Sequence, residues 1–158
     1  MVIGLGSPDR GDDGVGPVVA AEVGALRLAD VRVLTHEDPT CLVELWAGAD
    51  RVVVVDAVRS GAAPGTVHEL DATAGVLADR AWARTGRGGT HAFGVAAAVE
   101  LARALRRLPS RLVLVGVEGA SFEPGAALSP AVVRAVRPAA CAVARVLAPA
   151  EEASGVPR

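Results

Sequence analysis

Short apolar runs separated by polar, turn-rich segments recur along the chain, and their lengths are typical of β-strands. Five such runs predict strands at residues 2–6, 31–35, 52–55, 66–70 and 112–117. The four consecutive valines at 52–55 indicate a strand that is buried on both faces, as in the centre of a parallel sheet. Residues 66–70 alternate between apolar and polar side chains, which is typical of an edge strand.

Other segments place apolar residues every three or four positions, and this spacing predicts amphipathic helices. These residues are Val15, Val19, Val23 and Leu26 in the first segment, Val95, Ala98, Ala102 and Leu105 in the second, and Val133, Val136, Ala140 and Leu147 in the third. Asp38 and Pro39 begin a further short helix as N-cap and first helical residue, and Gly48 ends it. Pro138 lies inside the last helical segment, after the capping pair Ser129 and Pro130, so we expect a kink or two short helices there.

Strands that alternate with helices in this way predict an α/β fold. We expect a three-layer α/β/α sandwich with a mostly parallel (mixed) sheet of about five strands. Residues 1–158 form one domain on length, with 148–158 as a frayed tail. Ligands of such folds bind beyond the carboxyl ends of the strands, which selects the loops after Gly6, Thr35, Asp56 and Val117.

Composition then excludes several classes of protein. The chain has 158 residues, of which 51% are hydrophobic and 22% charged, so it is not intrinsically disordered. A net charge of -2 and 3% aromatic residues argue against a nucleic-acid partner. No apolar stretch approaches the ~18 residues of a membrane span, and the start does not have the pattern of a signal peptide, so we expect no membrane association and a cytoplasmic location. All sixteen basic residues are Arg, which excludes Lys-based Schiff-base chemistry.

Candidates for chemistry gather in these loops and in one further turn. Asp9, Arg10, Asp12 and Asp13 follow the first strand, Asp56 ends the third, and His91 lies in a glycine-rich turn before a helix. Two carboxylates and an imidazole that converge on one point suit a borderline divalent metal and leave positions open for a substrate atom. Each residue also has a structural interpretation. Asp13 is well placed to cap the helix that follows it, Asp56 to bond the turn at its strand end, and His91 to be a satisfied loop histidine.

Neighbouring polar residues carry weaker hypotheses. Asp12 is a candidate for the same site or, instead, for holding its loop by accepting backbone N–H bonds. His36 lies in a selected loop and is a weaker candidate for contacting substrate or supporting the site. His68 lies on the expected edge strand and is a weaker candidate still. The start Gly4-Leu5-Gly6 resembles a dinucleotide fingerprint, but Asp9 occupies the third glycine position and its charge opposes a pyrophosphate. The chain also contains no P-loop and no GxSxG elbow.

The first loop as a whole is distinctive. It reads Gly4-Leu5-Gly6-Ser7-Pro8-Asp9-Arg10-Gly11-Asp12-Asp13-Gly14-Val15-Gly16-Pro17. Asp56-Ala57 at a strand end, Thr90-His91 before a helix, and Glu118 followed by Leu128-Ser129-Pro130 come later in the chain. These motifs, in this order, closely resemble those of the nickel–iron hydrogenase maturation endopeptidases.

The resemblance implies an α/β/α sandwich that removes a C-terminal extension from the hydrogenase large-subunit precursor once nickel has been installed. The family's metal-contacting positions map onto Asp13, Asp56 and His91, which are expected to be the catalytic and metal-binding residues. Nickel is expected to arrive with the precursor, and cadmium or zinc to substitute for it in vitro. Arg10 and Arg59 are expected to contact acidic or carboxylate groups of the substrate tail.

Two departures from the family pattern are visible, because the family usually has Asn in place of Ser7 and Gly-Leu-Ser in place of residues 127–129. Two other functions remain open. One is a non-catalytic module that binds a metalloprotein partner, and the other is a small-molecule α/β hydrolase.

Overall fold

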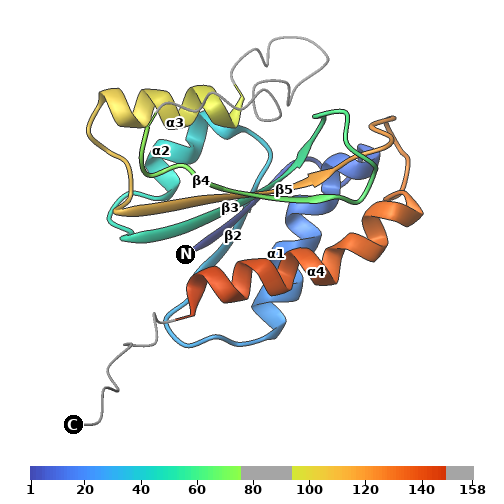
Figure 1. Cartoon of the computed structure of the whole chain (residues 1–158), viewed down its shortest axis with the longest axis horizontal. Helices are drawn as coiled ribbons and strands as arrows, with labels where there is room; N and C mark the ends of the chain where they lie inside the picture. The colour runs from blue at the N-terminus through green and yellow to red at the C-terminus, as the bar shows by residue number, and fades with distance from the viewer. Residues whose placement is uncertain (76–93, 149–158) are drawn as a thin grey trace, which may run out of the picture.

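A computed structural model describes residues 1–75 and 94–148 (Figure 1). It contains one five-stranded sheet in the order β2-β1-β3-β5-β4. The strands are β1 (Val2–Leu5), β2 (Val33–His36), β3 (Arg51–Val58), β4 (Val67–Asp71) and β5 (Arg111–Glu118). β4 alone in this sheet runs antiparallel, against β5, and the other pairs are parallel. The predicted α/β fold with a mostly parallel, mixed sheet is therefore confirmed, whereas His91 and the expected tail beyond residue 148 lie outside the described residues.

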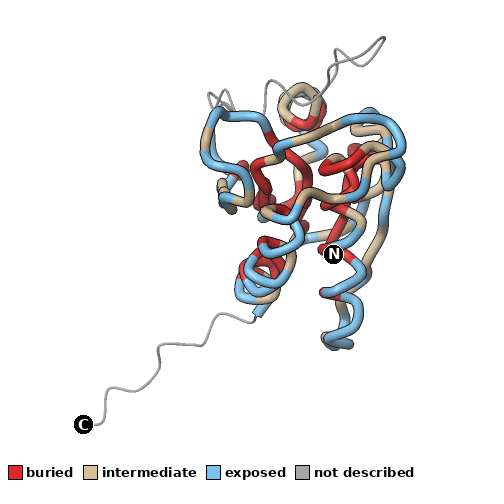
Figure 2. Tube along the Cα trace, turned by 90° about the vertical axis from the view of Figure 1, so that its right-hand side faces the viewer, coloured by how far each residue is buried: buried red, intermediate tan, exposed pale blue. Residues whose placement is uncertain are grey.

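Helices cover both faces of the sheet. They are η1 (Gly11–Gly14), α1 (Val15–Ala25), η2 (Pro39–Cys41), α2 (Leu42–Leu45), α3 (Val95–Ala104) and α4 (Pro130–Leu147). α1 and α4 pack on one face, and α2 and α3 on the other, with the buried residues concentrated between the layers (Figures 1 and 2). None of the helices within residues 1–75 and 94–148 is long and apolar enough to cross a membrane.

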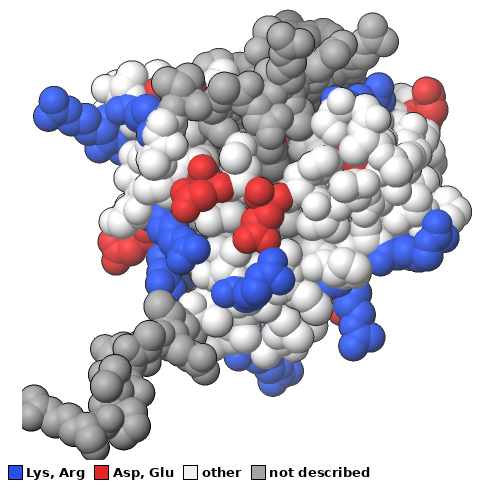
Figure 3. Space-filling view, in the orientation of Figure 1, with Lys and Arg blue, Asp and Glu red and all other residues white. Residues whose placement is uncertain are grey.

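Apart from Asp12, Asp56 and Glu118, which are buried, the charged residues that the structure describes reach the surface with both signs interspersed. Arg145 of α4 pairs with Glu69 of β4 at 2.7 Å. On the face drawn in Figure 3, basic side chains lie beside acidic ones and do not form a continuous stripe. Both signs of charge are therefore mixed on this face.

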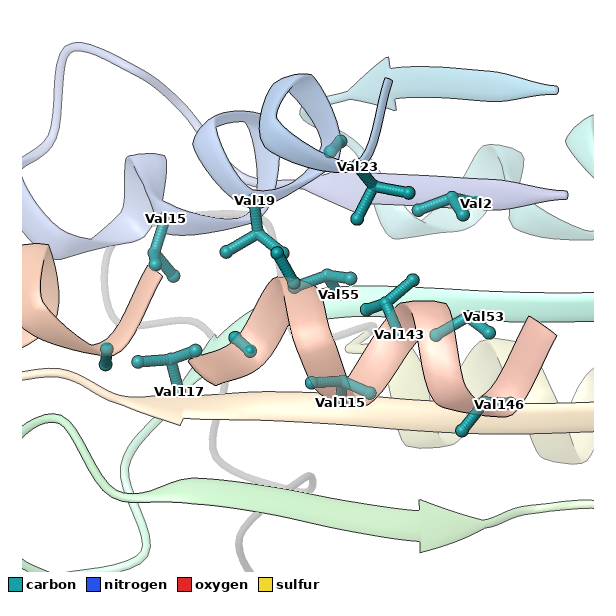
Figure 4. Close-up of a cluster of buried hydrophobic side chains, with 14 of the residues drawn as sticks. Val2, Val15, Val19, Val23, Val53, Val55, Val115, Val117, Val143 and Val146 are labelled. Atoms are coloured by element: carbon teal, nitrogen blue, oxygen red, sulfur yellow. The ribbon is translucent and has the colours of Figure 1, made fainter. Parts of the chain in front are cut away.

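The two sides of β3 explain its valine run. Val53 and Val55 face the layer of α1 and α4, where they join valines of β1, β5 and both helices in one core cluster (Figure 4). Val52 and Val54 point to the opposite face and pack in the second cluster with α2 and α3. Alternate side chains of a strand point to opposite faces, so a central strand covered on both sides needs apolar residues at every position.

The structure excludes one of the two expectations at Pro138. It has one continuous helix from Pro130 to Leu147 and not two short ones. A proline inside a helix removes a backbone hydrogen bond and costs about 3 kcal/mol. Pro138 is exposed, whereas its neighbours Ala135 and Ala139 are buried. The burial of the inner stripe offsets the local cost, so the helix continues past the proline.

The contact between α1 and the sheet depends on two glycines. A Cβ atom on Gly16 would lie 2.0 Å from the carbonyl oxygen of Leu5 and 2.6 Å from that of Val55. A Cβ atom on Gly4 would lie 2.3 Å from the carbonyl oxygen of Gly16. The first turn of α1 therefore rests directly on the backbone of β1 and β3. This contact fixes η1, which immediately precedes α1, at the carboxyl end of the sheet.

We expect Gly16→Ala to lower the free energy of unfolding by about 3 kcal/mol or more, because the added methyl overpacks a contact made by backbone atoms. Urea denaturation measures the change. Gly24→Ala on the same helix is the control, since its Cβ would meet only Val33 Cγ2 at 3.9 Å. That control should be neutral or stabilising by about 0.5–1 kcal/mol, because alanine favours helix. Equal effects of the two variants would contradict the proposed contact.

Candidate active site

The loop between β1 and η1 positions Asp13. Gly6 has a φ of +119°, and a Cβ atom there would lie 1.9 Å from the carbonyl oxygen of Asp13. The Asp13 Oδ2 atom accepts a hydrogen bond of 2.8 Å from the backbone N–H of Ser7. The N-cap of α1 is Gly14, which makes no side-chain capping bond. Asp13 therefore closes its own loop against the end of β1 and does not act as the cap of α1.

Asp56 lies near the carboxyl end of β3 and is 6% exposed. Its Oδ1 atom accepts a bond of 2.8 Å from the N–H of Ala57. Burial raises the pKa of the Asp56 carboxyl well above its usual range, and the nearby charge of Asp13 raises it further, against the smaller effect of the Ala57 N–H. The fold thus brings together two of the three residues proposed from the sequence.

Two carboxyl groups in a partly dehydrated site repel one another when both are ionised. A divalent cation would relieve this repulsion, and oxygen ligands leave such an ion able to accept softer ligands from a substrate. Within residues 1–75 and 94–148, no three His, Cys, Asp or Glu side chains are grouped to hold a metal. The third proposed ligand, His91, precedes Val95 of α3 by four positions and is outside these ranges.

Asp12, next to Asp13, is fully buried and has a different role. Its Oδ2 atom accepts bonds from the N–H groups of Ala120 at 2.7 Å and Ser121 at 2.9 Å, and its Oδ1 atom accepts one from Ser129 at 2.6 Å. Burial by itself would raise the pKa of Asp12, but these three N–H donors outweigh it and hold the pKa below its usual value. Asp12 therefore joins η1 to the loop between β5 and α4, as its structural interpretation predicted.

Glu118 at the end of β5 organises the neighbouring loop in the same way. It is 3% exposed. It accepts bonds from the N–H and hydroxyl of Ser60, at 3.1 and 2.7 Å, and from the N–H of Gly61 at 2.9 Å. His68 Nε2 lies 3.2 Å from the same carboxylate. Burial opposes ionisation, but the hydrogen bonds prevail and lower the pKa of Glu118.

Ser60, His68 and Glu118 do not form a catalytic triad, despite their residue types. The Ser60 hydroxyl donates to Glu118 and lies 3.5 Å from His68 Nε2, while the same ring nitrogen contacts the carboxylate. A triad needs the histidine between the serine and the acid, with one ring nitrogen for each. The three side chains instead fix the loop that follows β3.

His36 ends β2 beside Leu5 of β1. Its Nδ1 atom lies 3.1 Å from both the N–H and the carbonyl oxygen of Asp38, so the ring supports the turn into η2. Asp38 caps η2 as predicted, through a bond of 2.8 Å from the N–H of Thr40. β1 separates β2 from β3, so His36 lies at the same end of the sheet as Asp56 but not on an adjacent strand.

The sequence marked Glu118 as a strand end and as part of the family motifs but gave it no role, and its position lies two residues beyond that of Asp56 on the adjacent strand. In the register of β3 and β5, Val58 pairs with Glu118. An acidic residue at the carboxyl end of a buried strand was the available signal. The loops after β1, β3 and β5 meet at this end of the molecule (Figure 1).

The fold and site define a three-layer α/β protein with a carboxylate pair at the carboxyl edge of its sheet. Residues 37–146 match a family model described as HycI, hydrogenase maturation protease. The chain belongs to the hydrogenase maturation protease family, and this membership supports a peptidase activity. A comparison with curated protein sequences finds no match.

Solved structures agree with this assignment. The chain is 27% identical to the hydrogenase maturating endopeptidase HybD from Escherichia coli, with a TM-score of 0.69 over 92% of this chain and 90% of that one. It is also 27% identical to an endopeptidase from the same organism, with a TM-score of 0.72 over 93% and 91% of the two chains. A hydrogenase maturation protease HycI from Thermococcus kodakarensis, at 23% identity, has the same fold with a TM-score of 0.66 over 92% and 90%.

Asp12→Ala should lower the free energy of unfolding by about 3 kcal/mol at neutral pH, because three N–H groups lose a charged acceptor. Since the folded pKa is lowered, this contribution is present above the unfolded value of 3.8 and is lost as the pH falls through the folded value. Urea denaturation at pH 7 and at pH 3 tests both statements. Asp9→Ala in the same loop is the control. An equal loss in the two variants would contradict the role of Asp12.

Asp56→Asn should be more stable than the wild type at pH 7. The folded pKa of Asp56 is raised, so the wild type loses stability as the pH increases from 3.8 through the folded value. The difference in melting temperature between Asp56→Asn and the wild type should therefore become smaller as the pH falls towards 4. Asp50→Asn, which changes an exposed carboxyl directly before the other end of β3, is the control variant. A constant difference across the pH range would refute the raised pKa.

Proposed function

We propose that the chain is an endopeptidase that removes the C-terminal extension of a nickel–iron hydrogenase large-subunit precursor after nickel insertion. The observation that carries this proposal is the juxtaposition of Asp13 and Asp56 at the carboxyl edge of the sheet, in a member of the hydrogenase maturation protease family. Asp13, Asp56 and His91 are proposed to contact the nickel that the precursor brings.

The electrostatics of the carboxyl pair support a cationic substrate group. Asp56 is buried and its ionised form is disfavoured by dehydration and by Asp13. Binding of a divalent cation reverses this preference, because both carboxylates then gain an opposite charge. A precursor without nickel offers no such gain, so the pair discriminates between loaded and empty precursors by charge alone.

The ligand chemistry supports the same division of roles. Carboxylate and imidazole groups are hard or borderline ligands, whereas precursor cysteines supply soft thiolates that retain nickel. The protease therefore contacts the ion without extracting it. Once the nickel is held, the part of the precursor between the nickel and the C-terminal extension lies at the carboxyl edge of the sheet. The peptide bond to be cleaved then lies at the site. Nickel is a feature of the substrate in this scheme, and cadmium or zinc is proposed to replace it in vitro.

We expect Asp56→Ala, Asp13→Ala and His91→Ala to reduce trimming of a nickel-loaded precursor at least about 100-fold, because each removes a contact to the charged substrate group. Mass spectrometry of the precursor's C-terminus after incubation measures the product. Asp50→Ala, which removes an exposed carboxylate at the opposite end of β3, should trim like the wild type. Thermal unfolding of each variant separates loss of the site from loss of the fold.

Two results would overturn the proposal. Trimming by Asp56→Ala at the wild-type rate would remove the carboxyl pair from the reaction. Tight binding of the loaded precursor by the wild type without any cleavage would instead indicate a binding module. Calorimetric titration of nickel and cadmium into the wild type and His91→Ala complements these assays, since stoichiometric binding that the variant loses would place His91 with the carboxyl pair.

A further inference from the structure

The loop that follows β3 presents one arginine with an unusual setting. The guanidinium of Arg59 lies 3.9 Å from the centroid of the Phe122 ring, which is a cation–π contact between the β3–β4 loop and the β5–α4 loop. Arg59 is exposed. It follows Val58, the last residue of β3, and lies three positions beyond Asp56 in the sequence.

The Phe122 side of this contact is rigidly supported. A Cβ atom on Gly119 would lie 2.4 Å from Phe122 Cζ, so the ring packs directly on that glycine. Phe122 also packs against the core between the sheet and helices α1 and α4. Its loop is bound by Asp12 at Ala120 and Ser121, and the N–H of Asp12 donates to the carbonyl oxygen of Ser121 at 2.8 Å. The ring is therefore a fixed surface beside η1, the element that carries Asp13.

The backbone of Arg59 is held on both sides. The carbonyl oxygen of Val58 accepts a bond of 3.0 Å from Gly119, and the N–H groups of Ser60 and Gly61 donate to Glu118. Both oxygens of Glu118 are thereby engaged in the loop. Gly119 and Glu118 thus fix the backbone before and after Arg59. The ring of Phe122 contacts the Arg59 side chain.

The binding edge of this guanidinium is not used by the described part of the chain. Arg107 pairs with Glu44, and Arg145 pairs with Glu69. Arg103 donates to the carbonyl oxygens of Thr73 and Ala72. Within residues 1–75 and 94–148, Arg59 has the ring contact and no ion pair. An aromatic ring covers one flat face of a guanidinium and leaves the N–H fork in its plane open, which matches the geometry of a carboxylate.

We propose that Arg59, held on Phe122, binds a carboxylate of the peptide substrate. This inference rests on the proposed function, because it places the carboxylate on the same precursor. The carboxylate belongs either to an acidic side chain of the precursor's C-terminal extension or to the C-terminus of that extension, and both present the same planar acceptor.

Arg59→Gln should raise the KM for trimming of the nickel-loaded precursor about tenfold or more, because a charge-assisted bidentate bond is lost. The kcat should change less than about twofold, since Arg59 does not touch the reacting atoms. Arg59→Lys should recover only part of the affinity, because a lysine lacks the planar fork. Phe122→Leu, which keeps apolar packing but removes the ring, should raise KM in the same direction. Arg145→Gln is the matched control and should behave like the wild type.

Two substrate changes distinguish the sources of the carboxylate. A precursor with the acidic residues of its extension changed to amides tests the side chains, and a precursor with a C-terminal amide tests the terminus. The change that removes the bound carboxylate should raise the KM of the wild type to that of Arg59→Gln and have no added effect in that variant. If neither change does so, or if Arg59→Gln keeps the wild-type KM, the proposed contact is wrong.

A binding assay separates this proposal from the proposed function. A fluorescent peptide with the sequence of the extension is titrated with the wild type, Arg59→Gln and Arg145→Gln, and its anisotropy is measured. Weaker binding by Arg59→Gln alone supports the contact even if no cleavage is found, in which case only the peptidase proposal fails. Equal binding by all three proteins overturns the contact whether or not the wild type trims the precursor.

Discussion

The carboxylate of Asp12 connects two loops that are remote in the sequence, and the carboxyl edge of the sheet depends on this connection. Its three N–H partners belong to the β5–α4 loop and to the residue that precedes α4. The bonds fix η1 against that loop, so Asp13 has a defined position relative to the end of β3. They also hold the loop on which Phe122 packs. One buried, ionised side chain therefore orders both the carboxyl pair and the support of Arg59.

The Asp56 carboxyl destabilises the fold when it is ionised. A carboxyl group at 6% exposure beside a second carboxyl is costly to ionise, and an apolar or amide side chain would suit the empty fold better. An acid at this position is understandable if a cation visits the site, because the unfavourable charge then becomes binding energy. The same physical reasoning explains why the carboxyl groups of Asp12 and Glu118 differ from that of Asp56. They are surrounded by N–H donors, which stabilise the ionised form, whereas Asp56 has one such donor within residues 1–75 and 94–148.

The loops at the carboxyl edge are held by backbone N–H donors bonded to buried acids, and this arrangement leaves the guanidinium of Arg59 available to a ligand. Glu118 binds the backbone around Ser60 and Gly61, and Asp12 binds the loop of Phe122. Within residues 1–75 and 94–148, neither of these acids pairs with Arg59. A charged side chain that is fixed by a ring and a clamped backbone loses little conformational freedom when a ligand arrives, so it binds more strongly than a mobile surface arginine.

The sequence by itself determined the strands, the helices, the α/β fold and the edge of the sheet at which Asp13 and Asp56 lie. Hydrophobic periodicity is a local property, so the valine run of β3 and its end at Asp56 were readable without coordinates. The roles of Asp12 and Asp13 could not be read from the sequence, because two adjacent residues of the same type differ only in their partners. The Asp12 carboxylate accepts bonds from residues 108 to 117 positions away, and the Asp13 carboxylate accepts one from a residue six positions away. The tertiary structure likewise decided that Glu118 orders the loop after β3, that Pro138 stays within one helix, and that Arg59 meets Phe122. These features arise from contacts between distant segments, which packing creates and local pattern does not encode.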